Sequence, residues 1–234
     1  IETGADASAD VNLDDFMVFD NDSQRSQIFF LFLLTQHIIA AAKDIGLESE
    51  IPSTTKELIK QSFTEKRAVE EFVRACEGVP RDGINIISLA AQKAIDSSIS
   101  VNDIRAAANN WYQRDKEKAV SSNTIARDLL HWIIDQVIGQ RKARAFLLQA
   151  GEESEIIEAL YDSRVLHILK RGVSSHDQPG VRYDVYKLDY GCYVNLLSTS
   201  KAPQGLLPFE DSSSDEFIDV PPDDYRSIRR AILK

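Results

Sequence analysis

The sequence predicts a mainly α-helical protein with a small β-hairpin near its C-terminal end, which is an α+β fold. From residue 24 to about residue 118, apolar residues recur at helical spacing between residues that begin and end helices. Segments 165–173 and 181–197 are rich in Val, Tyr and Leu, and the turn-forming segment 174–180 separates them. Helices followed by a hairpin is the element order of a winged helix. We therefore expect a helical bundle followed by a winged-helix domain.

The expected bundle contains five short amphipathic helices, which begin near residues 24, 54, 64, 80 and 100. Thr54 with Glu57, and Ser100 with Asp103, have the spacing of capping boxes at helix starts. A proline at position 80 suits the first turn of a helix, where its missing N–H costs nothing. These signals predict a compact bundle over residues 24–118.

Segment 116–122 is mostly polar and predicts a linker, with a domain boundary between residues 118 and 123. Beyond it we expect a winged-helix domain over residues 123–200. Its elements are a helix at about 123–138, the segment 141–149, a second helical stretch at 152–161 and the hairpin.

Both ends of the chain are acidic. Residues 1–23 form an acidic lead-in, in which 13–19 is an extended segment or short strand. Residues 201–234 form an acidic tail with several prolines and a candidate terminal helix at 223–233. Of the net charge of −10, residues 1–22 carry −7 and residues 206–234 carry −3. The rest of the chain is neutral, so the overall charge does not decide whether it binds nucleic acid.

The composition favours a cytoplasmic protein without a membrane partner. Two cysteines are too few for a disulfide framework and fit a reducing compartment. No export signal begins the sequence. The most apolar run, 28–42, is interrupted by Thr35, Gln36 and His37 and falls short of the roughly 20 residues that cross a bilayer. We expect this run to be a core helix.

The most informative motif is Gly78-Val79-Pro80-Arg81, which opens the fourth expected helix. A helix that starts with proline fixes the direction of its first turn, so Arg81 projects from a rigid position. A guanidinium beside free N–H groups at a helix N-terminus can meet phosphate oxygens. For such a motif in isolation, a surface ion pair of Arg81 with Asp82 or Glu77 is the commoner explanation.

Segment 75–94 (ACEGVPRDGINIISLAAQKA), together with 99–108 (ISVNDIRAAA), resembles the lid of bacterial AAA+ ATPases related to the origin-recognition initiator clade. The resemblance covers about residues 24–197 and is better for the lid helices than for the winged helix. It implies that Arg81 is the sensor-2 arginine, which reaches the γ-phosphate of ATP, in the setting of Gly78 and Pro80.

The resemblance also implies a longer parent protein that binds ATP and Mg²⁺. The sequence has no G-x-x-x-x-G-K-[ST] phosphate loop, so we expect that this chain is not an enzyme alone and holds no cofactor. On this interpretation the chain is a C-terminal fragment, and segment 13–19 is the last strand of a missing ATPase core. That core would be its first partner.

No residue stands out as catalytic or metal-binding. The segment Ser175-His176-Asp177 has the residue types of a catalytic triad, but adjacent residues in a turn cannot align as one. His37, His131 and His167 lie on apolar stretches without a second ligand at helical spacing. We expect them to be satisfied core histidines.

Eight basic residues in the winged-helix region are candidate contacts to duplex DNA or to a protein partner. They are Arg141, Lys142, Arg144, Arg164, Lys170, Arg171, Arg182 and Lys187. The candidate recognition helix, near 152–164, carries four Glu and one Asp against one Arg, which suits a polyanion poorly. A protein or intramolecular contact is therefore at least as good an interpretation as DNA.

Three hypotheses follow. In the first, the bundle senses nucleotide and the winged helix transmits the response to a partner or to DNA. In the second, the chain is a stand-alone winged-helix regulator or protein-interaction adaptor, with the bundle as a dimerisation or effector domain. In the third, it is a hydrolytic enzyme with an unrecognised site, for which a deep pocket lined by carboxylates or histidines is required. The sequence leaves the partner and the oligomeric state open.

Overall fold

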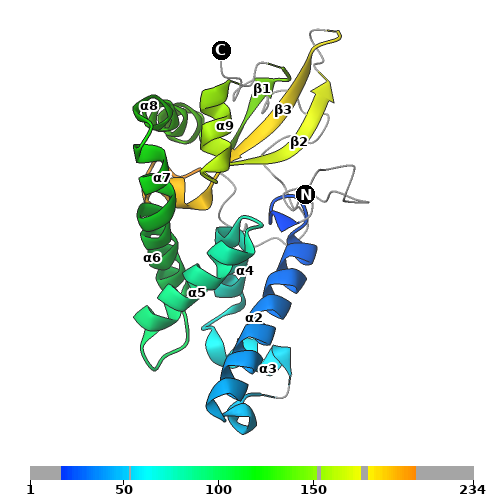
Figure 1. The fold of residues 1–234 in the computed structure, drawn as a ribbon, viewed down its shortest axis with the longest axis vertical. Coiled ribbons are helices and arrows are strands. Elements are labelled where there is room, and N and C mark those ends of the chain that lie inside the picture. Colours follow the sequence, from blue (N-terminus) through cyan, green and yellow to red (C-terminus); the bar gives the residue numbers. More distant parts are fainter. Residues whose placement is uncertain (1–16, 53, 152–153, 175–178, 204–234) are drawn as a thin grey trace.

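The computed structural model describes residues 17–52, 54–151, 154–174 and 179–203 (Figure 1). The chain is mainly helical with one three-stranded antiparallel sheet, which confirms the expected α+β class. The bundle contains α2 (Ser23–Ile45), α3 (Thr55–Ser62), α4 (Lys66–Cys76), α5 (Pro80–Ala94), α6 (Val101–Trp111) and α7 (Glu117–Ser121). The C-terminal part contains α8 (Thr124–Ile133), β1 (Ala145–Gln149), α9 (Glu155–Asp162), β2 (Leu166–Ser174) and β3 (Arg182–Leu188).

The helix starts follow the predicted capping signals. The hydroxyl of Ser100 accepts a hydrogen bond from the backbone N–H of Asp103, and the Asp103 carboxylate accepts one from the backbone N–H of Ser100. The hydroxyl of Thr54 accepts from the backbone N–H of Glu57. Each cap satisfies N–H groups that have no partner within the helix. The capping pattern therefore placed the beginnings of α3 and α6 correctly.

Helix α2 differs from the core helix that we expected. It has 23 residues, of which only Ser26, Phe30, Thr35 and Ala42 are buried. The side chains of Ile28 and Phe32 are 71% and 63% exposed. With a mean hydropathy of 1.6 over 18 residues, α2 is long and apolar enough to cross a membrane, a test that core helices and signal sequences also pass. The prediction of a core helix is therefore correct only for part of α2, where Phe30 lies in the hydrophobic core. The helix extends beyond the run 28–42, so the prediction that this segment is too short to span is wrong by length.

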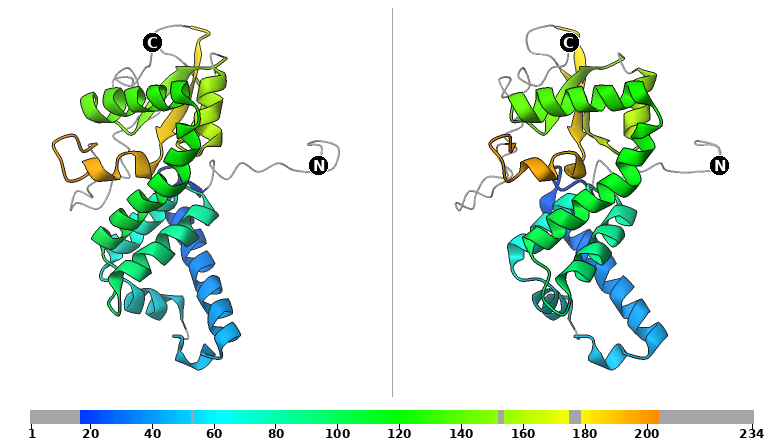
Figure 2. Two further views of the ribbon diagram at one scale, coloured as in Figure 1. Left: turned by 60° about the vertical axis from the view of Figure 1, so that its left-hand side comes forward. Right: turned by 90° about the vertical axis from the view of Figure 1, so that its left-hand side faces the viewer.

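The predicted linker is also helical. A π-helical turn over Tyr112–Lys116 continues α6 directly into α7. Figure 2 shows the two helices as one long run. A turn at residues 122–123 then leads to α8. Lys116 is 2% exposed because carboxylates surround its ammonium group. The segment was predicted to be a solvated linker because it is polar, but Lys116, one of its polar residues, is a member of a buried ion pair. Where the sequence predicted a domain boundary, between residues 118 and 123, the structure has the turn between α7 and α8.

The sheet has the order β1-β3-β2, so β1 pairs with the far side of the β2–β3 hairpin. The segment 141–149, which the sequence places between two helices, contains β1. Phe146 and Ile168 both pair with Tyr186, and these three side chains pack into the core with α8 and α9. Among the described residues, α9 is the one helix between β1 and β2. A further π-helical segment, Ile134–Gln140, extends α8.

The other face of the sheet contacts the segment at the N-terminal end of α2. Val18 is fully buried against Ala145, Leu169 and Val185. Gly78 has a φ of 76°, and a Cβ atom there would lie 3.1 Å from the backbone nitrogen of Val18. Glycine is therefore favoured at position 78 for two reasons: its φ is positive, and the backbone of Met17 and Val18 leaves little room for a side chain. Segment 17–22 lies between the α4–α5 corner and the sheet.

The two parts of the molecule share one hydrophobic core. The cluster of buried side chains runs without a break from Phe30 in α2 to Val194 after β3. After β3, the 3₁₀ turns Tyr190–Cys192 and Val194–Leu196 return to pack on α4 and α6. The bundle and the sheet are thus in firm contact rather than joined by a flexible connection.

Candidate functional site

Arg81 lies in the first turn of α5, at the surface of the bundle. Its side chain is 58% exposed, and its Nη2 atom donates a hydrogen bond to Oδ2 of Asp115 at 2.7 Å. Its Nε atom is 3.9 Å from Oδ1 of Asp82, and its guanidinium carbon is 5.8 Å from the centre of the Trp111 ring. The arginine is therefore accessible to solvent but paired with a carboxylate of its own bundle. The pair with Glu77 that the sequence allowed does not form among the described contacts.

Gly78 and Pro80 shape this corner without facing a ligand site. Pro80 is the first residue of α5, as expected. Gly78 and the preceding Glu77, which has a φ of 47°, form the left-handed turn between α4 and α5. The close approach of Met17 and Val18 accounts for the glycine without any phosphate. Of the motif's residues, only Arg81 has an exposed polar side chain.

Asp115 binds a second arginine from the C-terminal part. Arg164 follows α9, with its Nη2 atom bonded to the same Oδ2 atom of Asp115 and its Nη1 atom 2.7 Å from Oδ1 of Asp82. Its side chain is 27% exposed. Arg164 was predicted as a contact to DNA or a partner, but two carboxylates of the bundle hold it. The sequence showed its charge but not the acidic residues that face it.

Behind this pair lies a buried lysine. The ammonium of Lys116 is 2.8 Å from Oδ2 of Asp82 and is hydrogen-bonded to Asp189. Burial lowers the pKa of Lys116, but Asp189 and Asp82 outweigh burial and hold it above its usual range. Burial raises the pKa of Asp189, but Lys116 and His167 outweigh burial and hold it below its usual range. Both side chains are therefore charged at neutral pH.

His167 is buried with its Nε2 atom 3.2 Å from Oδ2 of Asp189. This confirms the expectation of a satisfied core histidine at position 167. His37 and His131, by contrast, are exposed, so that expectation is wrong for these two residues. Among the residues that the structure describes, no group of three or more His, Cys, Asp and Glu side chains could hold a metal ion. Ser175, His176 and Asp177 lie outside the described residues.

A second buried group surrounds Asp20. Its Oδ1 atom is 3.1 Å from Nη1 of Arg144 and 3.2 Å from Nη1 of Arg74. Its Oδ2 atom is 2.5 Å from the ammonium of Lys187, which is also 2.6 Å from Oε2 of Glu77. Burial raises the pKa of Asp20, but Arg144, Lys187 and Arg74 together outweigh burial and hold it below its usual range. One carboxylate from segment 17–22 thus binds cations from α4, from the start of β1 and from β3.

Arg144 and Lys187 therefore cannot contact DNA or a partner as predicted. Arg144 is 3% exposed and Lys187 is fully buried. Lys187 lies on the sheet face that segment 17–22 covers, next to the position of Val185. Alternation along a strand indicates which face Lys187 occupies but not what lies on that face, and this is why the sequence misplaced it. Arg144 precedes β1, and its partner Asp20 lies more than 120 residues away in the sequence.

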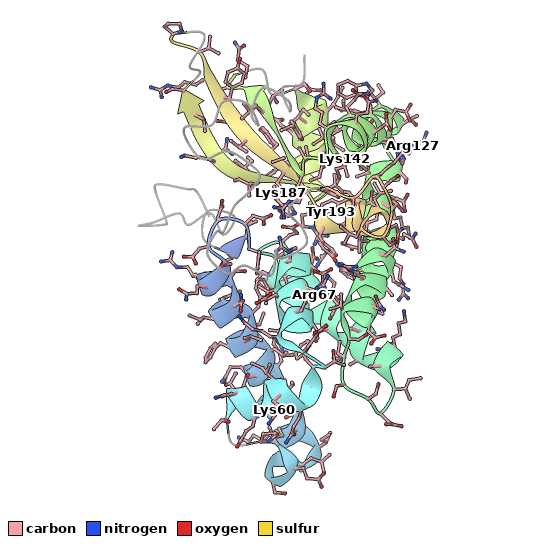
Figure 3. The ribbon with its side chains drawn as sticks, turned by 180° about the vertical axis from the view of Figure 1, so that it is seen from behind. Lys60, Arg67, Arg127, Lys142, Lys187 and Tyr193 are labelled. Carbon is pink, nitrogen blue, oxygen red and sulfur yellow. The ribbon has the colours of Figure 1, made fainter. Side chains whose placement is uncertain are left out.

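We call these charged groups between the bundle and the sheet the ionic junction; Figure 3 shows Lys187 and Tyr193 at its position. Its members are Asp20, Arg74, Glu77, Asp82, Lys116, Arg144, Arg164, Lys187 and Asp189, with Arg81 and Asp115 at its outer edge. Burial raises the pKa of Glu77 above its usual range, and Lys187 and His167 offset this only in part. A separate buried contact, from Arg105 and Tyr190 to the carboxylate of Glu71, also joins the two parts.

The remaining predicted basic contacts fall into two sets. Lys170, Arg171 and Arg182 are exposed on the β2–β3 hairpin, although Arg171 lies 3.4 Å from Asp184. Arg141 and Lys142 are half-buried and donate to the carbonyl oxygens of Gln136 and Ser200. The hairpin set is thus the part of the predicted surface that stays open to solvent.

Helix α9 presents acidic residues to solvent. Glu155, Glu158 and Asp162 are exposed, and the helix contains no Lys or Arg. A recognition helix that enters the major groove would bring these carboxylates close to phosphates. The arrangement does not favour α9 as a DNA-reading helix.

Comparisons with protein-family models, with curated proteins and with solved structures find no match to this chain.

The ionic junction predicts a large difference between two aspartates. Replacing Asp20 by Ala removes the carboxylate that binds Arg74, Arg144 and Lys187, and breaking a buried ion pair costs about 3–5 kcal/mol. Asp128, whose side chain is 67% exposed and pairs only with Arg127 among the described contacts, is the matched control. Asp128→Ala should change the free energy of unfolding by less than about 0.5 kcal/mol. Urea unfolding of both variants measures this, and equal effects would contradict the importance of the junction.

Proposed function

We propose that this chain is the nucleotide-sensing and partner-binding part of a cytoplasmic bacterial AAA+-type ATP-binding protein. In this proposal Arg81 meets the γ-phosphate of ATP that an ATPase core binds together with Mg²⁺. The C-terminal sheet then passes the response to a partner. The chain itself supplies no phosphate loop, so it does not hydrolyse ATP alone. The resemblance of segments 75–94 and 99–108 to the initiator-clade lid supports this proposal.

The observation that carries the proposal is the position of Arg81. Its guanidinium is more than half exposed, in the first turn of a 15-residue helix whose N–H groups and dipole favour an anion. Ile86 and Ala90 bury the opposite side of α5 in the core, so the helix is a rigid support. An arginine held in this way can reach a phosphate of a neighbouring domain without reorganising its backbone.

The pairing of Arg81 with Asp115 is compatible with this role because the pair lies at the surface, with the Arg81 side chain 58% exposed and the Asp115 side chain 28% exposed. A solvent-exposed ion pair contributes only about 0.2–1 kcal/mol, so a polyphosphate can replace the carboxylate at little cost. Through Asp115, Arg81 is one carboxylate away from Arg164 of the C-terminal part. Movement of the Arg81 side chain away from Asp115 would therefore alter the ion pair that Asp115 makes with Arg164, which precedes β2.

For the partner-binding side, we propose that the β2–β3 hairpin makes the contact. Lys170, Arg171 and Arg182 give it an exposed basic surface, whereas α9 is acidic. Such a hairpin would bind duplex phosphates without reading bases. The same surface would serve a stand-alone winged-helix regulator or adaptor, which is the alternative function. A winged-helix assignment of residues 123–200 is part of this proposal, and the order α8, β1, α9 and then the β2–β3 hairpin supports it.

The sensing role predicts the effect of Arg81→Ala in a protein that joins this sequence to an ATPase core. Loss of a guanidinium from the transferred phosphate should lower ATP turnover at least about tenfold, because such contacts stabilise the charge of the transition state. Arg127→Ala is the control, since Arg127 lies on α8 with its side chain 43% exposed and paired with Asp128. Steady-state phosphate release measures both variants. Unchanged turnover in Arg81→Ala would rule out the sensing role.

The hairpin contact predicts salt-dependent binding of duplex DNA by the chain itself. Replacing Lys170 and Arg182 by Gln should reduce the slope of log affinity against log salt by about two, because each phosphate contact contributes roughly one. Arg127→Gln should leave the slope unchanged. Fluorescence anisotropy with a labelled duplex at several salt concentrations gives the slopes. A slope that is the same in all three proteins would exclude the hairpin as the DNA contact and leave a protein partner.

A further inference from the structure

Two arginines and two aspartates form a closed arrangement where α5 meets the loop between α9 and β2. Arg164 binds both carboxylates, with Nη1 at 2.7 Å from Asp82 and Nη2 on Asp115. Arg81 binds Asp115 at 2.7 Å but is 3.9 Å from Asp82. The close ion pair of Arg81 therefore depends on Asp115 alone, whereas Arg164 has a second carboxylate.

The two carboxylates also differ in accessibility. The side chain of Asp82 is fully buried and receives hydrogen bonds from Arg164 and from the indole Nε1 of Trp111, the latter at 3.0 Å. The side chain of Asp115 is 28% exposed. Asp82 is thus a fixed part of the ionic junction, while Asp115 lies at its edge with Arg81. Arg81 can leave Asp115 without leaving Arg164 unpaired.

We propose that Asp115 is a built-in competitor for the anion that Arg81 senses. When no polyphosphate is present, Asp115 holds Arg81 beside Arg164; when a polyphosphate binds, Arg81 turns to it and Asp115 keeps Arg164 alone. This inference rests on the proposed sensing function and concerns the regulation of the same site. Asp115 acts through Arg81, so it is a positioning residue that sets the affinity and links the site to the C-terminal part.

The sign of the effect follows from Coulomb's law. A carboxylate within a few ångströms of Arg81 both occupies its donors and repels a second anion. Replacing Asp115 by Asn keeps the shape but removes the charge, so an anion should bind more tightly. Replacing it by Glu keeps the charge and should leave the affinity close to that of the wild type. Because the site is partly solvated, we expect a tightening of about three- to tenfold for Asn.

Trp111 provides a reporter at the site itself. Its ring lies beside the guanidinium of Arg81, and the chain contains only one other tryptophan, Trp132. In the full chain carrying Trp132→Phe, the emission of Trp111 is followed while inorganic tripolyphosphate is added at constant ionic strength. The dissociation constant should fall about three- to tenfold with Asp115→Asn and stay within twofold with Asp115→Glu. Adding Arg81→Ala to Asp115→Asn should abolish saturable binding.

Asp128→Asn is the control for a general change in charge, because this exposed carboxylate also pairs with an arginine. Equal affinities in the wild type and Asp115→Asn, both weakened by Arg81→Ala, would overturn the competition but leave the sensing role of Arg81 intact. Tripolyphosphate affinity that is unchanged by Arg81→Ala would overturn both the competition by Asp115 and the sensing role of Arg81. Absence of saturable binding by Asp115→Asn, or an equal gain with Asp128→Asn, would also overturn the competition.

Discussion

The structure depends on the rule that buried charges must be paired. Lys116 and Lys187 are enclosed between the bundle and the sheet, where an unpaired ammonium would cost several kcal/mol. Their carboxylate partners come from segments far apart in the sequence: Asp20 before α2, Glu77 and Asp82 around the start of α5, and Asp189 after β3. In this arrangement each buried ammonium lies within 3 Å of two carboxylates from different segments.

This constraint gives the junction a specific geometry rather than a large net stability. Paired buried charges roughly repay the cost of their desolvation, but a misplaced partner leaves a charge unpaired. Apolar contacts through Val18 and the shared core supply the favourable burial. The ions then determine how the bundle, segment 17–22 and the sheet meet.

Arg81 lies at the outer edge of the ionic junction, where its side chain is exposed to solvent. The interior of the junction is closed, but its outer edge, at Asp115, ends in an exposed pair. A ligand at Arg81 therefore acts on the same carboxylate that holds Arg164 of the C-terminal part. The proposed sensing function uses this shared carboxylate, and it needs no flexible connection between the bundle and the sheet.

The sequence predicted the features that depend on local chemistry. Capping pairs such as Ser100 with Asp103 located helix starts, and Val and Tyr around a turn located the hairpin, because these signals act over a few residues. It failed where distant segments decide the outcome. Lys187 looked like a strand residue open to solvent, and Lys116 looked like part of a linker.

The missed residues left one usable signal in the sequence. Lys187 stands between Tyr186 and Leu188 in an apolar strand end, and Asp189 follows at once. A charged residue among apolar ones is expected to be buried with a partner of opposite charge. Glu77 and Asp82, at the start of an amphipathic helix, are candidate partners in the sequence. Periodicity alone cannot show which cation meets which carboxylate, since that depends on how the elements pack. The pairing of Asp20 with three cations could only be seen in the structure.

The shared core and the ionic junction together should make the bundle and the sheet one cooperative unit. The two tryptophans allow a direct test, because Trp111 ends α6 in the bundle and Trp132 lies on α8 in the C-terminal part. Each can be made the single reporter by changing the other to Phe, and urea unfolding can be followed by emission. We expect the same midpoint and slope from Trp111 and from Trp132. Two separate transitions, with one part unfolding while the other stays folded, would contradict it.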